Sequence, residues 1–341
     1  MVSFTAALLS LALGFFASSV VAVPAEHPVS RRAPCSQIDV HKEWRDLTTT
    51  EKADYIRAVK CLMTTPPREQ REAVTNRYEE FQATHILLTE RVHSVGHFLP
   101  WHRHLNNLYH GALRNECGYT GPFTFWDWSR DADSTLPLKN SPIFDPNTGF
   151  GGDGVPGTYK LPPDPKGESF TNVGNYKGCI GDGPFKGVMV HRGPGKLITT
   201  HCIVRGIDES WRRGVVSSNV NNIIQTSATY ERFRLTIDDL MRGHIHGSGH
   251  GIVGGEMLNI YSAGADPLFY LHHANLDRVW WKWQNANPSQ RTYELSGPTT
   301  QQGKIQITLD FMMDFPALGP NITVRDVMDA SQSPSCFKYA Y

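Results

Sequence analysis

The chain has 341 residues, of which 40% are hydrophobic, and its 33 basic and 33 acidic residues give a formal net charge of zero. This length suffices for a substantial core in one large domain or two smaller ones. The balanced charge gives no sign of the basic patch that a nucleic-acid partner requires, so we expect none. Histidine, with 15 residues, is the outlier of the composition.

The N-terminus has the pattern of a secretory signal. Residues 5–23 are almost wholly apolar or small, and Val20 and Ala22 satisfy the small-residue rule before a cleavage point. A membrane anchor is the alternative, but the strongly apolar run is short and Pro24 with a polar stretch follows it. We therefore expect a signal peptide over residues 1–22, secretion to the extracellular space, and no membrane association after cleavage.

Three further features concern the maturation of a secreted chain. Arg31-Arg32 is a candidate processing site, which makes residues 23–32 a propeptide and 33–341 the mature domain; the alternative is two surface arginines. Asn321 opens an N-x-Thr sequon, a candidate glycosylation site. An even number of cysteines in a secreted chain predicts disulfides, whose connectivity the sequence leaves open: Cys35, Cys61, Cys117, Cys179, Cys202 and Cys336.

Helical patterns come first along the remaining chain. Residues 68–82, which follow Pro66-Pro67, are expected to form a helix, and a second helix begins at Pro100 with apolar residues at helical spacing. Glycines and prolines crowd residues 140–195. That stretch predicts mostly loop, and its length favours a lid or wall over a site.

Helices also dominate the second half. One is expected over about residues 228–242. The clearest start is Asp266-Pro267, an N-cap acid followed by a proline at the first helical position, and this helix should reach about Asn285. Alternation over residues 304–311 predicts a strand. The chain should therefore be mainly α, with long loops and few short strands.

Most of the histidines gather in two clusters. Buried imidazoles cannot all be charged, and a metal is an economical way to hold several neutral ones together. On a helix His246 and His250 share one face, as do His273 and Asp277, so the Asp277 carboxylate could accept a hydrogen bond from a ligand histidine. The clusters are His85, His93, His97, His102 and His104, and His244, His246, His250, His272 and His273.

Two motifs carry a family resemblance. The run from His93 through Phe98-Leu99-Pro100-Trp101-His102-Arg103 resembles the first copper motif of tyrosinases and hemocyanins. The run from Asp266-Pro267 through His272-His273-Ala274-Asn275 to Asp277-Arg278 is similar to their second copper motif. The chain thus resembles short secreted fungal members of the type-3 copper family, which includes tyrosinases and catechol oxidases.

The resemblance implies a ligand set and a fold. Two copper ions would lie in a central four-helix bundle, since bundles build metal sites from inward side chains on facing helices. His85, His93 and His102 would bind copper A, and His246, His250 and His273 would bind copper B. His272 falls outside the ligand pattern and is expected to pack beside the site.

The resemblance also implies a reaction. Three imidazoles per ion leave positions for O2 and a phenolic substrate, and imidazole suits copper well. Zinc accepts three histidines too but is redox-silent, so a zinc hydrolase is one alternative. A hemocyanin-like O2 carrier is another. We expect oxidation of ortho-diphenols, and of ortho-aminophenols as a close variant, to ortho-quinone-type products and water.

Departures from the family pattern bear on the substrate. Gly247 follows His246, where many monophenol-hydroxylating members have asparagine, and Arg91 stands where a thioether-forming cysteine would be. Ile260 occupies the position of a gatekeeper over one copper, and Phe269 should pack behind the substrate ring. The small residues at Gly247, Gly249 and Gly251 suggest an open site. We expect a catechol oxidase without a C-terminal lid domain; a tyrosinase with monophenol hydroxylase activity is the alternative. The natural phenol and the oligomeric state stay open.

Overall fold

The computed structural model describes Met1 and residues 35–167, 175–239 and 243–341. The predicted signal peptide (beyond Met1) and propeptide lie outside these ranges. Helices dominate and strands are two to five residues long, which confirms the expected mainly α fold. In the described part of the chain, no helix is both long and apolar enough to cross a membrane.

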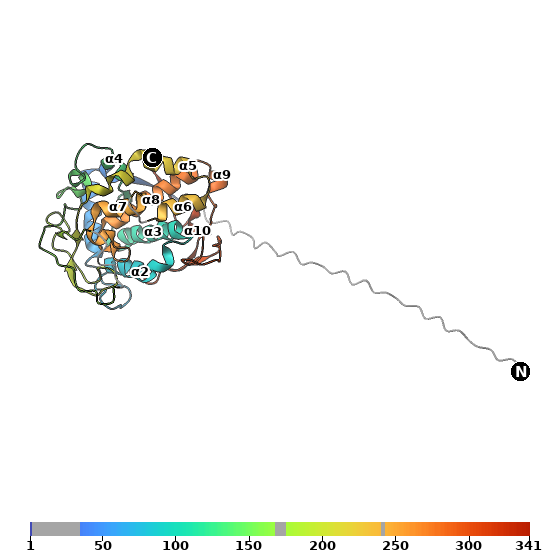
Figure 1. Ribbon diagram of the computed structural model, residues 1–341, viewed down its shortest axis with the longest axis horizontal. Coiled ribbons are helices and arrows are strands. Elements are labelled where there is room, and N and C mark those ends of the chain that lie inside the picture. Colours follow the sequence, from blue (N-terminus) through green and yellow to red (C-terminus); the bar gives the residue numbers. More distant parts are fainter. Residues whose placement is uncertain (2–34, 168–174, 240–242) are drawn as a thin grey trace. The chain divides into compact units, whose positions relative to one another are not determined.

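Four helices form the centre of the domain (Figure 1). They are α2 (Arg77–Val92), α3 (Phe98–Cys117), α7 (Ile245–Val253) and α8 (Leu268–Asn285). Helix α3 packs against α2 and α8, and α8 packs against α7. The expected central four-helix arrangement is therefore present. The other helices are α1 (Thr49–Leu62), α4 (Trp128–Ala132), α5 (Ser217–Thr226), α6 (Tyr230–Asp238), α9 (Pro288–Arg291) and α10 (Arg325–Met328).

Local hydrogen bonds explain where the central helices begin. The Leu268 amide, the first of α8, donates to the Asp266 carboxylate (3.0 Å), so the acid bonds the start of the helix as expected, but Pro267 and not Asp266 is the N-cap residue. The expected helix over 68–82 is wrong at both ends, because α2 starts at Arg77 and runs to Val92. The Asn76 side chain accepts from the Glu79 amide (3.0 Å) and fixes that start.

The strands are short and hold the periphery together. Strand β1 (Asp39–Glu43) lies between β2 (Thr124–Phe125) and β9 (Phe337–Tyr339), parallel to both. Three two-stranded antiparallel ladders complete the sheets: β3 (Gly178–Cys179) with β6 (Val204–Arg205), β4 (Met189–Val190) with β5 (His201–Cys202), and β7 (Met312–Met313) with β8 (Ile322–Thr323).

Of two expectations about non-helical segments, the strand over 304–311 is wrong and the loop over the described part of 140–195 is confirmed. In place of the expected strand, Gln306 forms one isolated bridge with Pro298, and the nearest strand is β7. The described part of 140–195 is mostly loop, as predicted, with two short 3-10 turns (Leu138–Asn140 and Pro142–Phe144) at its start and the two-residue strands β3 and β4 near its end.

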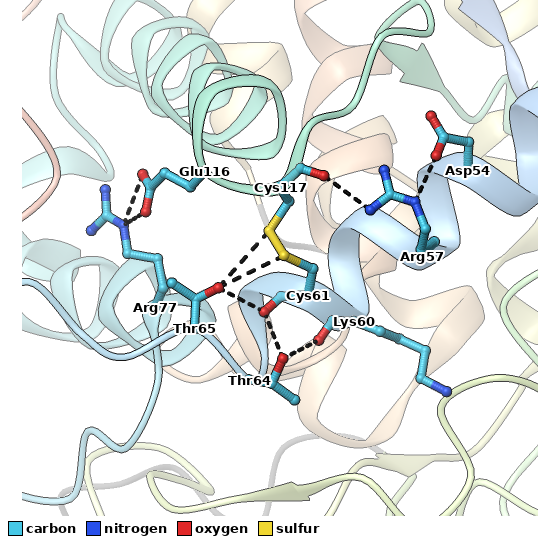
Figure 2. The surroundings of a disulfide bond; sticks show 9 residues. All are labelled: Asp54, Arg57, Lys60, Cys61, Thr64, Thr65, Arg77, Glu116 and Cys117. Atoms are coloured by element: carbon cyan, nitrogen blue, oxygen red, sulfur yellow. Dashed lines mark hydrogen bonds and ion pairs between the residues drawn. A yellow bond between two sulfur atoms is a disulfide. The ribbon is translucent and has the colours of Figure 1, made fainter.

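All six cysteines form disulfides, which confirms that they pair: Cys35–Cys336, Cys61–Cys117 and Cys179–Cys202. Figure 2 shows the second of these, which joins the last turn of α1 to the last residue of α3. The Arg57 guanidinium donates to the Cys117 carbonyl beside it (2.9 Å), so α1 also satisfies a carbonyl at the end of α3.

Candidate metal centre

Two groups of buried histidines face each other inside the bundle. The ligand nitrogens of His85 in α2, His93 just after α2 and His102 in α3 lie within 4.8 Å of one another. The second group comes from α7 and α8 and has the same compactness; it consists of His246, His250, His272 and His273. The two groups adjoin, because the rings of His102 and His273 stack with their centroids 4.4 Å apart.

Burial keeps these imidazoles neutral. It lowers the pKa of His85 to about 4 and the pKa values of His93 and His250 to about 3. Burial also holds the pKa values of His102 and His273 well below the usual range, and neighbouring histidines lower them further. A neutral imidazole keeps the lone pair that a metal needs, so the environment favours binding of a cation over protonation.

Backbone carbonyls decide which nitrogen carries the proton. Nδ1 of His102 bonds the Phe98 carbonyl (2.8 Å), and Nδ1 of His250 bonds the Met257 carbonyl (2.6 Å). Nδ1 of His85 and of His93 face carbonyls in the same way, at 3.0 Å and 2.9 Å. A carbonyl only accepts, so Nδ1 must hold the proton and Nε2 presents the lone pair.

The free nitrogens match the chemistry of a metal site. Among the described residues, five histidines of the two groups have a buried Nε2 atom without a hydrogen-bond partner: His85, His102, His246, His272 and His273. Buried polar atoms are normally paired, and an unpaired set that converges on one place points to a missing cation. Six neutral imidazoles in two groups of three fit two copper ions.

His272 is the exception in the second group. The Trp128 indole nitrogen lies 3.1 Å from His272 Nδ1. An indole N–H only donates, so Nδ1 must accept, and the proton of the neutral ring sits on Nε2. His272 therefore offers no lone pair to a metal while this bond lasts. Its neighbour His273 has no such constraint from Trp128.

The carboxylate of Asp277 has partners other than the histidines. Its Oδ1 accepts from Arg103 Nε (2.6 Å), and its Oδ2 accepts from the Tyr339 hydroxyl (2.6 Å). The expectation that it accepts from a ligand histidine therefore gives way to a different role. Asp277 joins α8 to α3 and to β9, and burial raises its pKa although Arg103 opposes that shift.

The three residues expected to contact the substrate lie in different surroundings. Ile260 and Phe269 line a small cavity together with histidines of both groups. Its free volume is about 10 Å³, roughly the room for one water, so a phenol ring enters only if lining side chains move. The Phe269 ring packs 4.3 Å from that of His273. Gly247 is buried in α7 and is not among the lining residues in the described part of the chain.

Gly249 and Gly251 of α7 serve packing, which replaces the interpretation that these two residues open the site. A Cβ at Gly249 would lie 2.2 Å from the His272 ring, and a Cβ at Gly251 would lie 2.1 Å from the Trp211 ring. Both distances are far below any van der Waals contact. These positions let the helix approach two large rings closely.

Three residues that matter for the site were not predicted. The carbonyls of Met257 and Tyr261 orient ligand histidines, and backbone acceptors leave no mark in a sequence. Glu256 is fully buried beside them. A lone acid among glycines and apolar residues is the one signal that could have revealed it, since such acids are rarely buried unpaired.

The candidate glycosylation residue Asn321 is exposed, and its side-chain amide donates to the Asp314 carboxylate (3.1 Å).

Comparisons with known proteins agree with this geometry. Residues 75–286 match the model of the common central domain of tyrosinase. A tyrosinase-like protein of Diaporthe leptostromiformis is 31% identical, over 91% of this chain and 75% of that protein. An N-acetyl-6-hydroxytryptophan oxidase of Emericella nidulans is also 31% identical, over 88% and 92%. A polyphenol oxidase variant of Thermothelomyces thermophila shares the fold with a TM-score of 0.78 and 27% identity, over 89% of both chains.

Proposed function

Because the chain belongs to the tyrosinase family, we propose that it oxidises ortho-diphenols to ortho-quinones with O2 at a pair of copper ions. The family implies a dicopper oxidoreductase. The substrate, the ligand set and the cellular location are our proposals. The observation that carries the ligand set is the arrangement of six neutral imidazoles in two adjoining groups, of which four orient Nε2 through a carbonyl at Nδ1.

We assign His85, His93 and His102 to copper A and His246, His250 and His273 to copper B. The hydrogen bond from Trp128 supports His273 over His272, because it puts the proton of His272 on Nε2 and leaves no lone pair there for a metal. Two copper ions would bind O2 and take up the electrons of the phenol. Each diphenol loses two electrons and two protons, so two diphenols reduce one O2 to two waters.

The protein surroundings favour diphenols. A simple phenol has a pKa near 10, like the tyrosine side chain, and is mostly protonated at pH 7. Gly247 has no side chain to hold a water that could remove the proton of a monophenol before ring hydroxylation. A diphenol needs only to lose electrons and protons. Ile260 at the cavity then limits the width of the ring that can approach.

Copper quantitation followed by oxygen uptake tests the proposal. We expect two copper ions per chain and uptake with catechol, 4-methylcatechol and ortho-aminophenol far above uptake with tyrosine. One zinc and no copper would sink the dicopper assignment. Equal oxygen uptake with tyrosine and with its diphenol would instead support a tyrosinase with hydroxylase activity. Reversible O2 binding with no product from catechol would indicate an O2 carrier.

Secretion is proposed as well. The three disulfides are compatible with an oxidising compartment, where such bonds persist. Sequencing the N-terminus of the mature protein from culture medium would test both the cleavage after residue 22 and the processing at Arg31-Arg32. Retention of the full chain inside the cell would contradict the proposal.

A further inference from the structure

One short stretch of backbone, residues 256–262, touches both histidine groups; we call it the bridging segment. The Met257 carbonyl accepts from Nδ1 of His250 (2.6 Å). The Tyr261 carbonyl accepts from Nδ1 of His85 (3.0 Å). Between these two carbonyls, the segment also lines the cavity at Ile260. The conformation of the bridging segment therefore fixes the orientation of one histidine ring in each group and the position of one wall of the cavity.

Side chains at the two ends of the bridging segment bond each other. The Ser262 hydroxyl donates to one oxygen of the Glu256 carboxylate, and His201 Nε2 lies 2.6 Å from the other oxygen. Both Glu256 and Ser262 are completely buried. Within the segment, the Asn259 side chain accepts from the Tyr261 amide (3.0 Å). The ends and the middle are thus fixed independently of the histidine ligands.

The surroundings are built to hold this carboxylate. His201 Nδ1 faces the Thr199 carbonyl (3.1 Å) and hydroxyl oxygen (2.9 Å), and that hydroxyl donates its own proton to the Gly193 carbonyl. Nδ1 must therefore donate, and a second proton must lie between Nε2 and the Glu256 carboxylate, because two lone pairs do not form a hydrogen bond. Gly193 has φ +109°, and a Cβ there would lie 3.0 Å from both Glu256 oxygens. Only glycine allows the loop to close over the carboxylate.

We propose that Glu256, Ser262 and His201 form a positioning cluster for the bridging segment, so that one set of hydrogen bonds controls metal affinity in both histidine groups and the width of the entrance at Ile260. The inference rests on the proposed function only in taking both groups as copper sites. None of the three residues touches the metals or the substrate. They act through the carbonyls of Met257 and Tyr261.

The test compares copper release from purified holoprotein into a chelator. Removing the hydroxyl in S262A frees one end of the segment, and we expect both coppers to leave about tenfold faster, the lower range for loss of an outer partner of a metal ligand. Copper per chain is followed with time, and electron paramagnetic resonance detects chains that hold a single copper(II). The KM for a bulky ortho-diphenol should change relative to that for catechol, with kcat less affected.

Matched variants distinguish a positioning role of the cluster from a general loss of stability. S141A removes another buried hydroxyl, which accepts from the Ile143 amide far from the bridging segment in sequence, and should release copper like the wild type. E256Q keeps the shape and an acceptor for Ser262 and should stay within about twofold of the wild type, whereas E256A should resemble S262A.

Three results would overturn the inference. They are copper release from S262A at the wild-type rate, release from one site only, and equal acceleration in S141A. Each leaves the proposed function intact, since the wild type still holds two coppers. A wild-type protein without copper would overturn the proposed function and this inference together.

Discussion

In this protein, a single hydrogen-bond partner decides whether a histidine side chain can offer a lone pair to a metal. His272 and His273 are neighbours on α8, both buried, yet the Trp128 indole fixes the tautomer of the first alone. The family motif places the ligand at the second histidine of the pair, and the tautomer supplies a physical reason for that choice. The reason was invisible in the sequence, because Trp128 is far from both along the chain.

The tautomer assignment predicts opposite results for two adjacent substitutions. His273→Ala should lose one copper per chain and abolish oxidation, because it removes an Nε2 lone pair. His272→Ala should keep both coppers, although loss of a buried ring costs stability, roughly 2–4 kcal/mol. Copper per folded chain, measured by mass spectrometry, decides the matter. Loss of a copper from His272→Ala to the same extent as from His273→Ala would contradict the assignment.

The proposed preference for diphenols rests on Gly247. If the added amide of Gly247→Asn reaches the cavity at the histidines, it can hold a water there, and the ratio of monophenol to diphenol turnover should rise. We expect a rise of up to about 100-fold, the lower end of what a positioned proton acceptor contributes. Oxygen uptake with tyrosine and with its diphenol gives the ratio. An unchanged ratio in a variant that holds two coppers would refute the water-positioning explanation.

At the scale of elements, the sequence predicted well where a local signal coincided with a strong pattern. The Asp266-Pro267 start signal and the following apolar run predicted α8 nearly to its last residue. The start of α2 was missed, because Pro66-Pro67 suggested an earlier helix while the Asn76 cap decides the actual start. The strand expected over 304–311 shows that alternation alone does not create a ladder without a partner strand.

The histidine groups were predicted by motif, and their supporting contacts were not. Spacing placed His246 and His250 on one face of a helix, which α7 confirms. Asp277 shares a helix face with His273, but tertiary contacts with Arg103 and Tyr339 take its carboxylate elsewhere. Pairings of this kind join segments far apart in the chain, so helical periodicity cannot reveal them.

The disulfide between α1 and α3 should stabilise helix α3, which carries His102 of the first histidine group. Cys61 and Cys117 close a loop with a sequence separation of 56, and replacing both by alanine should lower the free energy of unfolding by about 4 kcal/mol. Removal of Cys179–Cys202, with a separation of 23, should cost about 3 kcal/mol. Denaturant titration of both double variants gives the comparison. A negligible cost for the longer loop would contradict the entropic account.

Across the whole molecule, the burial of neutral histidines makes the fold sensitive to acid. Burial lowers the pKa of His41 to about 3, and its ring stacks on Phe337 at 4.2 Å, far along the chain from the histidine ligands. His110, beside it, is also buried and has a pKa well below the usual range. The unfolded chain takes up protons near pH 6.5, whereas the folded chain does so only near pH 3 at His41.

Stability should therefore be complete above pH 6.5 and fall as the pH drops from 6.5 toward 3. Each such histidine contributes about 1.4 kcal/mol per pH unit in that window. His41→Phe should preserve the stacking. The variant should take up one proton fewer on unfolding, so its unfolding free energy should fall less steeply as the pH drops. Urea titrations of the wild type and the variant between pH 6 and pH 4 measure it. Identical slopes would show that His41 is not held neutral in the folded chain.

The bond between Cys35 and Cys336 has a mechanical consequence. The two residues are 301 positions apart, and the bond closes nearly the whole domain into a covalent ring. A force applied at residue 35 and at Tyr341 would load the sulfur bridge and the few residues after Cys336, and the helices would carry none of it. Reduction of this one bond would release up to roughly 1,000 Å of extensible chain. In a single-molecule pulling experiment, the oxidised protein should behave as a nearly inextensible link and the reduced one as a long spring.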